Sequence, residues 1–507
     1  MERPEEIKST LKKLESAGFE AYIVGGCVRD LLMDKKPKDW DVTTNATPEE
    51  IQKVFPESFY ENKFGTVGVK TESSDETLKV IEITTYRIES KYTDKRHPDE
   101  IKFASKLDDD LKRRDFTINA LAMNDKGEIV DLFDGQKDIK NKLIRAVGDA
   151  KQRFSEDALR MMRAIRLAIE LDFEIDKAAK GAIKENSGWI AAISKERIRD
   201  ELIKIINHTP LIWLQAQQKR KRKSNEITKE EFEHGPARTF ELMREVGLLR
   251  HILPELEEGY GVTQNKHHVY TVWEHNLRSF VYAIKENFNF WVRLAALFHD
   301  IAKPRTKRGE GPDSTFYGHD VVSSRMTIQI MNRLKFPRND IEKVSLFVRY
   351  HLFQSDPEKI TDSAVRRVVR NVGKDNIWDL INVRLCDRIG SGVPKAEPYR
   401  LRKFLVLLEK ALREPVSLKQ LKINGEKIME VLKIVPGPKV GYILNALMSE
   451  ILDDPQKNKE EYLERRSLEL AKLSDKELEK LASQAKEKMA KIEYKKEEET
   501  KQKYWVS

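Results

Sequence analysis

Cysteine is nearly absent from this chain: 507 residues contain two, Cys27 and Cys386, and no Cys-x-x-Cys pair. This scarcity excludes a disulfide scaffold and a thiolate zinc site, and it fits a reducing compartment. No stretch approaches the ~20 consecutive apolar residues of a membrane-spanning helix, and residues 1–6 lack the apolar core of a signal peptide. The sequence therefore predicts a cytoplasmic protein with no membrane partner.

The chain also lacks a strong excess of one charge, since it has 93 basic and 84 acidic residues and a net charge of +9. That balance permits nucleic-acid binding without requiring it. The basic run 218–223 fits a solvated loop about as well as a contact with phosphates. Residues 460–503, rich in both Lys and Glu, indicate a charged helix with a solvated end.

The length predicts several domains, and the pattern changes along the chain. Short strands are expected near 20–24, 39–44, 66–71 and 78–85, with helices at 4–16 and from Thr117. Beyond Phe154 helical periodicity dominates, through 155–169, 195–206, 240–246, 272–287 and 292–301. The expected fold class is α+β, with an α/β head followed by all-α parts.

The chemistry begins where an apolar run ends in Gly25 and Gly26, which let the backbone approach phosphate oxygens. Asp39 and Asp41 follow in a β-prone segment, where alternate residues share a face and two carboxylates bind Mg²⁺ together. The pattern predicts two-metal phosphoryl transfer. Glu82, a single acid among apolar and β-branched neighbours, is the expected third carboxylate; the alternative is a surface acid on an edge strand.

Residues 22–44 resemble the nucleotidyltransferase signature of the tRNA nucleotidyltransferase and bacterial poly(A) polymerase family, in its bacterial and eukaryotic class. The resemblance implies a polymerase-β-like head that binds nucleotide through Gly25, Gly26 and Arg29. It also implies five parts in order along the chain: a head at 1–145, a helical neck at 146–212, a body at 213–260, an HD domain at 261–400 and a C-terminal extension at 401–507.

Residues 112–120 match the second motif of that family, in which Arg113, Arg114 and Asn119 are implied to bind nucleotide. Arginine supplies fixed donors to triphosphate or ribose oxygens. Asp115 or Thr117 could also cap the following helix. The segment 92–100 resembles the loop of enzymes that add the terminal A as well as C, and 131–135 resembles the family's hinge.

The neck motif at 156–166 places Asp157, Arg160 and Arg163 on a slowly drifting polar stripe if the segment is one helix. The stripe could be a simple i, i+3 salt bridge. An acceptor beside a donor also fits the pairing edges of cytosine and adenine and rejects those of uracil and guanine. By resemblance, Asp157 and Arg160 act as a protein template, supported by Arg163 and Arg166. Residues 194–202 match a further motif, interpreted as structural support.

A second set resembles the metal ligands of HD-type phosphohydrolases: His275, His299, Asp300 and Asp387, with His319 and His351 as further family-like histidines. Such ligands suit a divalent ion (Mg, Mn or Ni) that activates water against a phosphoester. The alternative is a degenerate HD domain whose residues satisfy a helical core.

The resemblance as a whole implies a CCA-adding enzyme that uses tRNA, CTP, ATP and Mg²⁺. A poly(A) polymerase or an A-adding enzyme of the same fold is the nearest alternative, although residues 61–67 lack the arginine pair associated with poly(A) synthesis. A phosphatase or cyclic phosphodiesterase with an RNA-binding head, and a tRNA-binding module without activity, are the rivals from other classes.

Overall fold

A computed structural model describes residues 3–62, 65–90, 100–207, 227–265, 269–353, 356, 358–393, 396–413 and 418–506. The loop expected at 92–99 and the basic run at 218–223 lie outside these residues. The chain forms two compact units: one comprises residues 1–351 and 379–396, and the other comprises 352–378 and 397–507. The five-part division implied by the resemblance stays a prediction.

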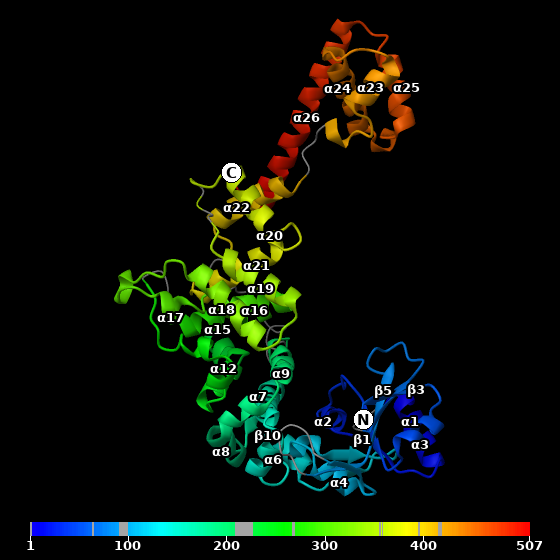
Figure 1. Cartoon of the computed structure of the whole chain (residues 1–507), viewed down its shortest axis with the longest axis vertical. Coiled ribbons are helices and arrows are strands. Elements are labelled where there is room, and N and C mark those ends of the chain that lie inside the picture. Colours follow the sequence, from blue (N-terminus) through cyan, green and yellow to red (C-terminus); the bar gives the residue numbers. More distant parts are fainter. Residues whose placement is uncertain are drawn as a thin grey trace. The chain divides into compact units, whose positions relative to one another are not determined.

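A mixed seven-stranded sheet forms the head, with the strand order β3-β4-β5-β2-β1-β8-β9 (Figure 1). Its strands are β1 Ala21–Val24, β2 Asp41–Thr44, β3 Ser58–Asn62, β4 Thr66–Lys70, β5 Val80–Thr85, β8 Leu121–Met123 and β9 Ile129–Asp131. Helices of the head are α1 Glu5–Ser16, α2 Gly26–Leu32, α3 Pro48–Val54, α4 Leu107–Lys112 and α5 Gly135–Lys140. A hairpin of β6 Arg87–Ser90 and β7 Glu100–Phe103 is separate from this sheet.

Strand β2 lies at the centre of the sheet, and three of its four residues, Val42, Thr43 and Thr44, are buried. Val42 is fully buried and packs in one core with Ile23 of β1 and Ile83 of β5. Strand β2 runs antiparallel to β1 and parallel to β5, which brings Asp41 opposite Glu82. The expected α+β class is confirmed, but the helix expected from Thr117 is only the 3₁₀ turn η1, Thr117–Asn119.

Helices dominate the rest of the first unit, as expected beyond Phe154. They are α6 Ala150–Glu156, α7 Leu159–Leu171, α8 Lys177–Asn186, α9 Lys195–Asn207, α11 Lys229–Glu233, α12 Ala237–Glu245, α13 Leu249–Ile252, α14 Pro254–Glu257, α15 Val272–Lys285, α16 Phe290–Phe298, α17 Lys303–Thr306, α18 His319–Arg333, α19 Arg338–Tyr350 and most of α21, Ile377–Gly390. Two-residue strands β10 Leu143–Ile144 and β11 Glu174–Ile175 pair in parallel.

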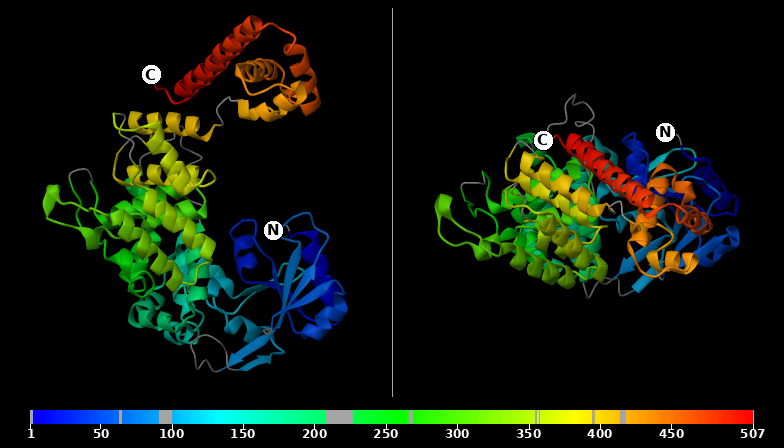
Figure 2. Two further views of the ribbon diagram at one scale, coloured as in Figure 1. Left: turned by 45° about the horizontal axis from the view of Figure 1, so that its top comes forward. Right: turned by 90° about the horizontal axis from the view of Figure 1, so that it is seen from above.

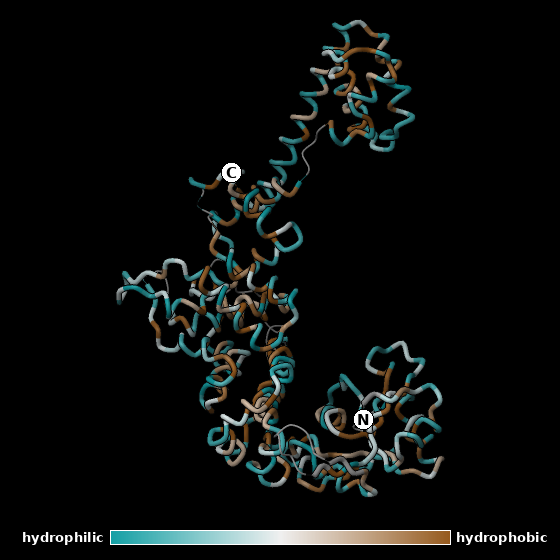
Figure 3. The backbone as a smooth tube through the Cα atoms, viewed as in Figure 1, coloured by the Kyte–Doolittle hydropathy of each residue, from teal (hydrophilic) through white to brown (hydrophobic). Residues whose placement is uncertain are grey.

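The second unit is also helical, with α20 Asp362–Val372, α22 Tyr399–Leu412, α23 Gly425–Leu432, α24 Pro438–Asp453, α25 Glu460–Leu470 and α26 Asp475–Lys503. The long helix α26 lies beside α24 (Figure 2), and most of its residues are hydrophilic (Figure 3). Its first turn is fixed by a capping box between Ser474 and Glu477. Among the described residues, no helix is long and apolar enough to cross a membrane.

Candidate active sites

Two glycines line a cavity of about 560 Å³ beside strand β1. Gly25 is the N-cap of α2 and has φ 84° and ψ −133°, a conformation that favours glycine. A Cβ atom at Gly25 would lie 3.0 Å from Nη1 of Arg114. Both the backbone conformation and the close approach of Arg114 favour a residue without a side chain. This agrees with the predicted turn from the glycine pair into a helix.

Two of the three expected carboxylates line the same cavity. Asp41 is the first residue of β2, whereas Asp39 lies in a bend before it, so the expectation that both stand on one strand was wrong. Glu82 lies opposite Asp41 on β5, but its side chain is exposed and is not among those lining the cavity. Burial and the neighbouring Asp39 raise the pKa of Asp41 to about 6, against the opposing charge of Arg114. The negative charges of Asp39 and Asp41 repel each other, and a divalent cation bound between the two carboxylates would relieve this repulsion.

A buried carboxylate outside the expected set binds both motif arginines. The side chain of Asp110, in α4, is fully buried. Its Oδ1 accepts hydrogen bonds from Nε and Nη2 of Arg113 at 2.9 and 2.6 Å, and its Oδ2 accepts one from Nη2 of Arg114 at 3.0 Å. Burial raises the pKa of Asp110, but the two guanidinium charges outweigh it and hold this pKa below its usual value. The i, i+3 and i, i+4 spacings were the sequence signal for this cluster.

Hydrogen bonds connect four further polar side chains that line the cavity. Arg29 donates to Oδ1 of Asn119 at 2.8 Å, and Nδ2 of Asn119 donates to Asp115 at 3.2 Å. Arg163 donates to Oδ2 of Asp115 through Nε and Nη2, at 2.8 and 2.6 Å. Burial raises the pKa of Asp115, but Arg163 overcomes this effect and the pKa falls well below its usual value. Asp115 therefore orients Arg163, a role that the helix-capping alternative did not contain.

The neck residues do not form one helical stripe. Helix α6 ends at Glu156, α7 begins at Leu159, and Asp157 between them is extended, with φ −143° and ψ 103°. Asp157 accepts hydrogen bonds from Nη1 and Nη2 of Arg197 at 3.2 and 2.7 Å, while Arg160 donates to Glu156 at 2.7 Å. The i, i+3 salt bridge considered from the sequence is thus replaced by two separate ion pairs.

The cavity gathers most of the expected nucleotide-binding residues. Arg166 reaches it while donating to Glu201 at 2.5 Å and to Glu170 at 2.7 Å. The expected residues that line the cavity are Gly25, Gly26, Arg29, Asp39, Asp41, Arg114, Asn119, Arg163 and Arg166. Those that do not line it are Glu82, Arg113, Asp157 and Arg160.

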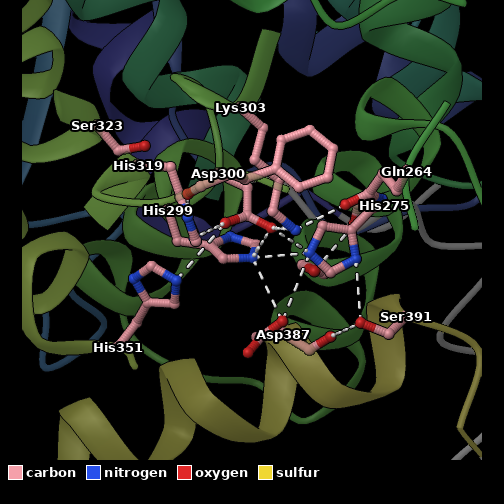
Figure 4. Close-up of polar contacts among 12 residues, drawn as sticks. Gln264, His275, His299, Asp300, Lys303, His319, Ser323, His351, Asp387 and Ser391 are labelled. Atoms are coloured by element: carbon pink, nitrogen blue, oxygen red, sulfur yellow. Dashed lines mark hydrogen bonds and ion pairs between the residues drawn. The ribbon is translucent and has the colours of Figure 1, made fainter. Parts of the chain in front are cut away.

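A second cluster joins the four expected HD residues from α15, the end of α16 and α21 (Figure 4). Nε2 of His275 lies 2.9 Å from Oδ2 of Asp300 and 2.8 Å from Nε2 of His299. Oδ1 of Asp387 lies 3.5 Å from His275 and 3.7 Å from His299. All four residues are buried, and one ligand atom from each lies within 4.8 Å of the others.

Asp300 is shared with a second group, formed with His319 and His351. Each of these two histidines, like His299, has its Nδ1 2.6 to 2.9 Å from a carbonyl oxygen three residues earlier. Because a carbonyl only accepts, Nδ1 must donate, and Nε2 of a neutral ring is left as a lone pair facing Asp300. Nε2 of His319 and Nε2 of His351 lie 3.0 and 3.5 Å from Oδ1 of Asp300, and within the described part of the chain none of these three buried atoms makes a hydrogen bond. This donor set fits a divalent cation.

The charges around Asp300 explain its ionisation. Burial raises its pKa, but Lys303 and the histidines hold the carboxyl well below its usual range. Nζ of Lys303 lies 2.6 Å from Oδ2 of Asp300 and donates to Gln264 at 2.6 Å. Burial lowers the pKa of His299, but Asp300 and Asp387 together raise it to about 9.

Family models match the two regions of the chain that contain these clusters. Residues 21–145 match the family described as poly A polymerase head domain, and residues 272–389 match the HD domain. Between the two matches, residues 172–210 fit the description "probable RNA and SrmB-binding site of polymerase A". Strand order and helical content agree with a polymerase-β-like nucleotidyltransferase head followed by a helical body. Head and HD domains of these families generally depend on divalent metals.

Curated relatives match the chain over part of their length. The CCA-adding enzyme of Lactobacillus delbrueckii is 53% identical over 196 residues, which are 38% of this chain and 48% of the relative. The CCA-adding enzyme of Ligilactobacillus salivarius is 49% identical over 207 residues, 40% of this chain and 50% of the relative. The matched region thus spans about half the length of these relatives.

A solved structure shares the fold of nearly the whole chain. The Bacillus stearothermophilus CCA-adding enzyme in complex with CTP superposes with a TM-score of 0.55, at 24% identity, over 92% of this chain and 98% of the other. At this identity the likeness concerns the fold alone.

Proposed function

We propose that the head domain adds C, C and A to the 3′ end of tRNA from CTP and ATP, without a nucleic-acid template. The observation that carries the proposal is the cavity that brings Asp39 and Asp41 together with Gly25 and Arg114. The names of the relatives, CCA-adding enzymes, support these substrates. Such a protein acts in the cytoplasm.

In this proposal, the cavity side chains position the triphosphate. Asp39 and Asp41 would hold Mg²⁺, whose charge would favour in-line attack of the tRNA 3′ hydroxyl on the α-phosphorus of CTP or ATP as pyrophosphate leaves. The glycine turn admits phosphate oxygens close to the backbone. Arg114 donates to the phosphates from a side chain that is already oriented by Asp110, so less conformational entropy is lost when the nucleotide binds. Glu82 is proposed as the third carboxylate because it pairs with Asp41 on the adjacent strand, although it does not line the cavity.

Base selection is assigned to Asp157 and Arg160, as an acceptor beside a donor. Two contacts support a role for them beside the nucleotide. Nη2 of Arg160 donates to the carbonyl oxygen of Arg113 at 3.1 Å, which joins the neck to the motif arginines. The paired hydrogen bonds from Arg197 fix the carboxylate of Asp157. Arg163 and Arg166 support the pair from the cavity wall.

The test is a tRNA that lacks its 3′ CCA, incubated with Mg²⁺ and with CTP and ATP singly and together, followed by sequencing of the RNA ends. We expect C-C-A with both nucleotides and C-C with CTP alone. Asp41→Asn should abolish addition, while Asp108→Asn, which removes an exposed carboxylate of α4, should leave it unchanged. No incorporation by the wild type refutes the proposal; long A tails select a poly(A) polymerase, and A alone on a C-C end selects an A-adding enzyme.

A second activity is proposed for the HD cluster, because the buried Nε2 atoms of His319 and His351 converge on Oδ1 of Asp300, at 3.0 and 3.5 Å. Lys303 stands beside them as a positive group for a phosphoester. The metal is Mg, Mn or Ni, and the candidate reaction is hydrolysis of a 2′,3′-cyclic phosphate. Each metal is added to the metal-free protein, and hydrolysis is followed by the appearance of the ring-opened 2′- or 3′-phosphomonoester. Asp300→Asn should abolish it, and Asp313→Asn, at an exposed site, should not; equal rates in both variants would make the cluster structural.

A further inference from the structure

Helix α20, in the second unit, has one apolar face and one strongly basic face. Val365, Val369 and Val372 are buried. The opposite face exposes Arg366, Arg367 and Arg370 (helix labelled in Figure 1). At 100° per residue these three arginines fall within roughly one third of a turn, so their charges point the same way.

No acid balances these arginines. The helix contains one acidic residue, Asp362, and its Oδ2 lies 3.4 Å from Nζ of Lys410 instead. Within the described part of the chain, no ion pair involves Arg366, Arg367 or Arg370. Most other exposed helices of this unit mix the two signs, as in α26, where Lys501 pairs with Glu497 and Glu498.

The arrangement costs the isolated helix stability, because like charges three and four residues apart repel each other. Solubility alone does not require charges of one sign, because a helix face that carries both acidic and basic side chains is equally soluble and avoids this repulsion. Arginine also presents a planar set of donors that matches phosphate oxygens in pairs. Repulsion without compensation therefore indicates an anionic partner that lies along the helix.

We propose that the basic face of α20, formed by Arg366, Arg367 and Arg370, binds the phosphate backbone of the RNA substrate. The proposal rests on the proposed function for the choice of RNA. A lipid surface fits less well, because none of the large apolar side chains exposed in the described chain belongs to α20. Phosphate contacts need no base sequence, so this face contributes affinity and orientation, and base choice stays with the neck residues Asp157 and Arg160.

The test measures the affinity of the full-length protein for labelled tRNA lacking its 3′ end, by fluorescence anisotropy over a series of salt concentrations. The variant Arg366→Gln/Arg367→Gln/Arg370→Gln should weaken binding at least about tenfold near 0.1 M salt. Its log Kd against log salt slope should fall by about three, about one for each lost phosphate contact. The matched control, Lys480→Gln/Lys486→Gln/Lys491→Gln, removes the same charge from exposed positions of α26 and should change neither quantity.

Equal losses in both variants would reduce the effect to net charge and overturn the proposal, as would unchanged tRNA binding in the arginine variant. Loss of binding to anionic phospholipid vesicles or to poly-glutamate, with tRNA binding intact, would assign the face to another partner. Thermal unfolding checks that α20 stays folded. The two proposals fail separately: a wild type that binds tRNA through α20 yet adds no nucleotide contradicts the proposed function alone. When addition works, the arginine variant should raise KM for tRNA and leave kcat unchanged.

Discussion

Replacing Asp110 by asparagine tests the role of one buried carboxylate that does not line the cavity. The substitution keeps the shape and removes the negative charge that three hydrogen bonds from Arg113 and Arg114 share, at 2.6 to 3.0 Å. Both guanidinium groups are mostly buried, with side chains 16% and 17% exposed. Removing one partner of such a buried cluster costs about 3 to 5 kcal/mol in free energy of unfolding. We expect a loss near the lower end, about 3 kcal/mol, because the amide oxygen still accepts one hydrogen bond.

Urea unfolding and CTP titration measure the two consequences. Asp110→Asn should lower the free energy of unfolding and raise KM for CTP about tenfold, since Arg114 loses its orientation. Asp108→Asn, on the exposed side of the same helix, should match the wild type. If both variants unfold alike and bind CTP alike, Asp110 does not orient the arginines.

The same variant should also change the acid limb of stability. The pKa of Asp110 in the folded protein is below its ordinary value of 3.8. The carboxylate therefore contributes its full stabilisation above pH 3.8 and loses it as the pH falls towards the folded-state pKa. Asp110→Asn should remove this part of the pH dependence, and an acid limb that is identical in both proteins would contradict the assignment.

Three further outcomes are expected. Gly25→Ala should abolish nucleotide addition, because a Cβ meets Arg114 at 3.0 Å and φ is 84°; full activity would show that the turn is not needed. Arg197→Gln should relax the choice of C and A towards U and G, because Asp157 loses two hydrogen bonds. Misincorporation of U and G measures this change. Arg197→Lys keeps the positive charge, so rescue by this variant would show that charge, and not the paired hydrogen bonds, is what matters. Metal affinity of the HD cluster should rise about tenfold per pH unit up to about pH 9, because the proton that competes with the ion leaves His299 there. Calorimetry at several pH values measures this affinity, and an affinity that does not change with pH would contradict the expectation.

The sequence predicted the head well because its signals are local. An apolar run, two glycines and two aspartates lie within 21 residues, and strand β2 then pairs where β-branched residues favour it. The fine placement of Asp39 depended on where β2 begins, which is set by hydrogen bonding to its neighbours, and periodicity does not define a strand end to within two residues.

Residues that act through contacts distant in sequence were harder to predict. Asp157 was assigned to a helix because residues 155–169 are periodic, yet Arg197, 40 positions later, binds its carboxylate where the helix breaks. For Asp115, capping was the alternative considered together with Thr117, because the local sequence does not reveal a contact with Arg163, 48 positions later. In the HD cluster, the His-Asp pair came from resemblance, and only the fold shows that His319 and His351 face Asp300.

The HD cluster also links ion binding to folding. His299 and His351 are held at the ends of α16 and α19 because Nδ1 of each ring donates to a backbone carbonyl oxygen three residues earlier. The ligand geometry is therefore formed during folding, before any ion binds. Asp300 and Asp387 are buried within this cluster. An ion that binds only this folded arrangement stabilises it by mass action. A chelator should then act on this protein as a mild denaturant, with a midpoint of unfolding that depends on the concentration of free metal.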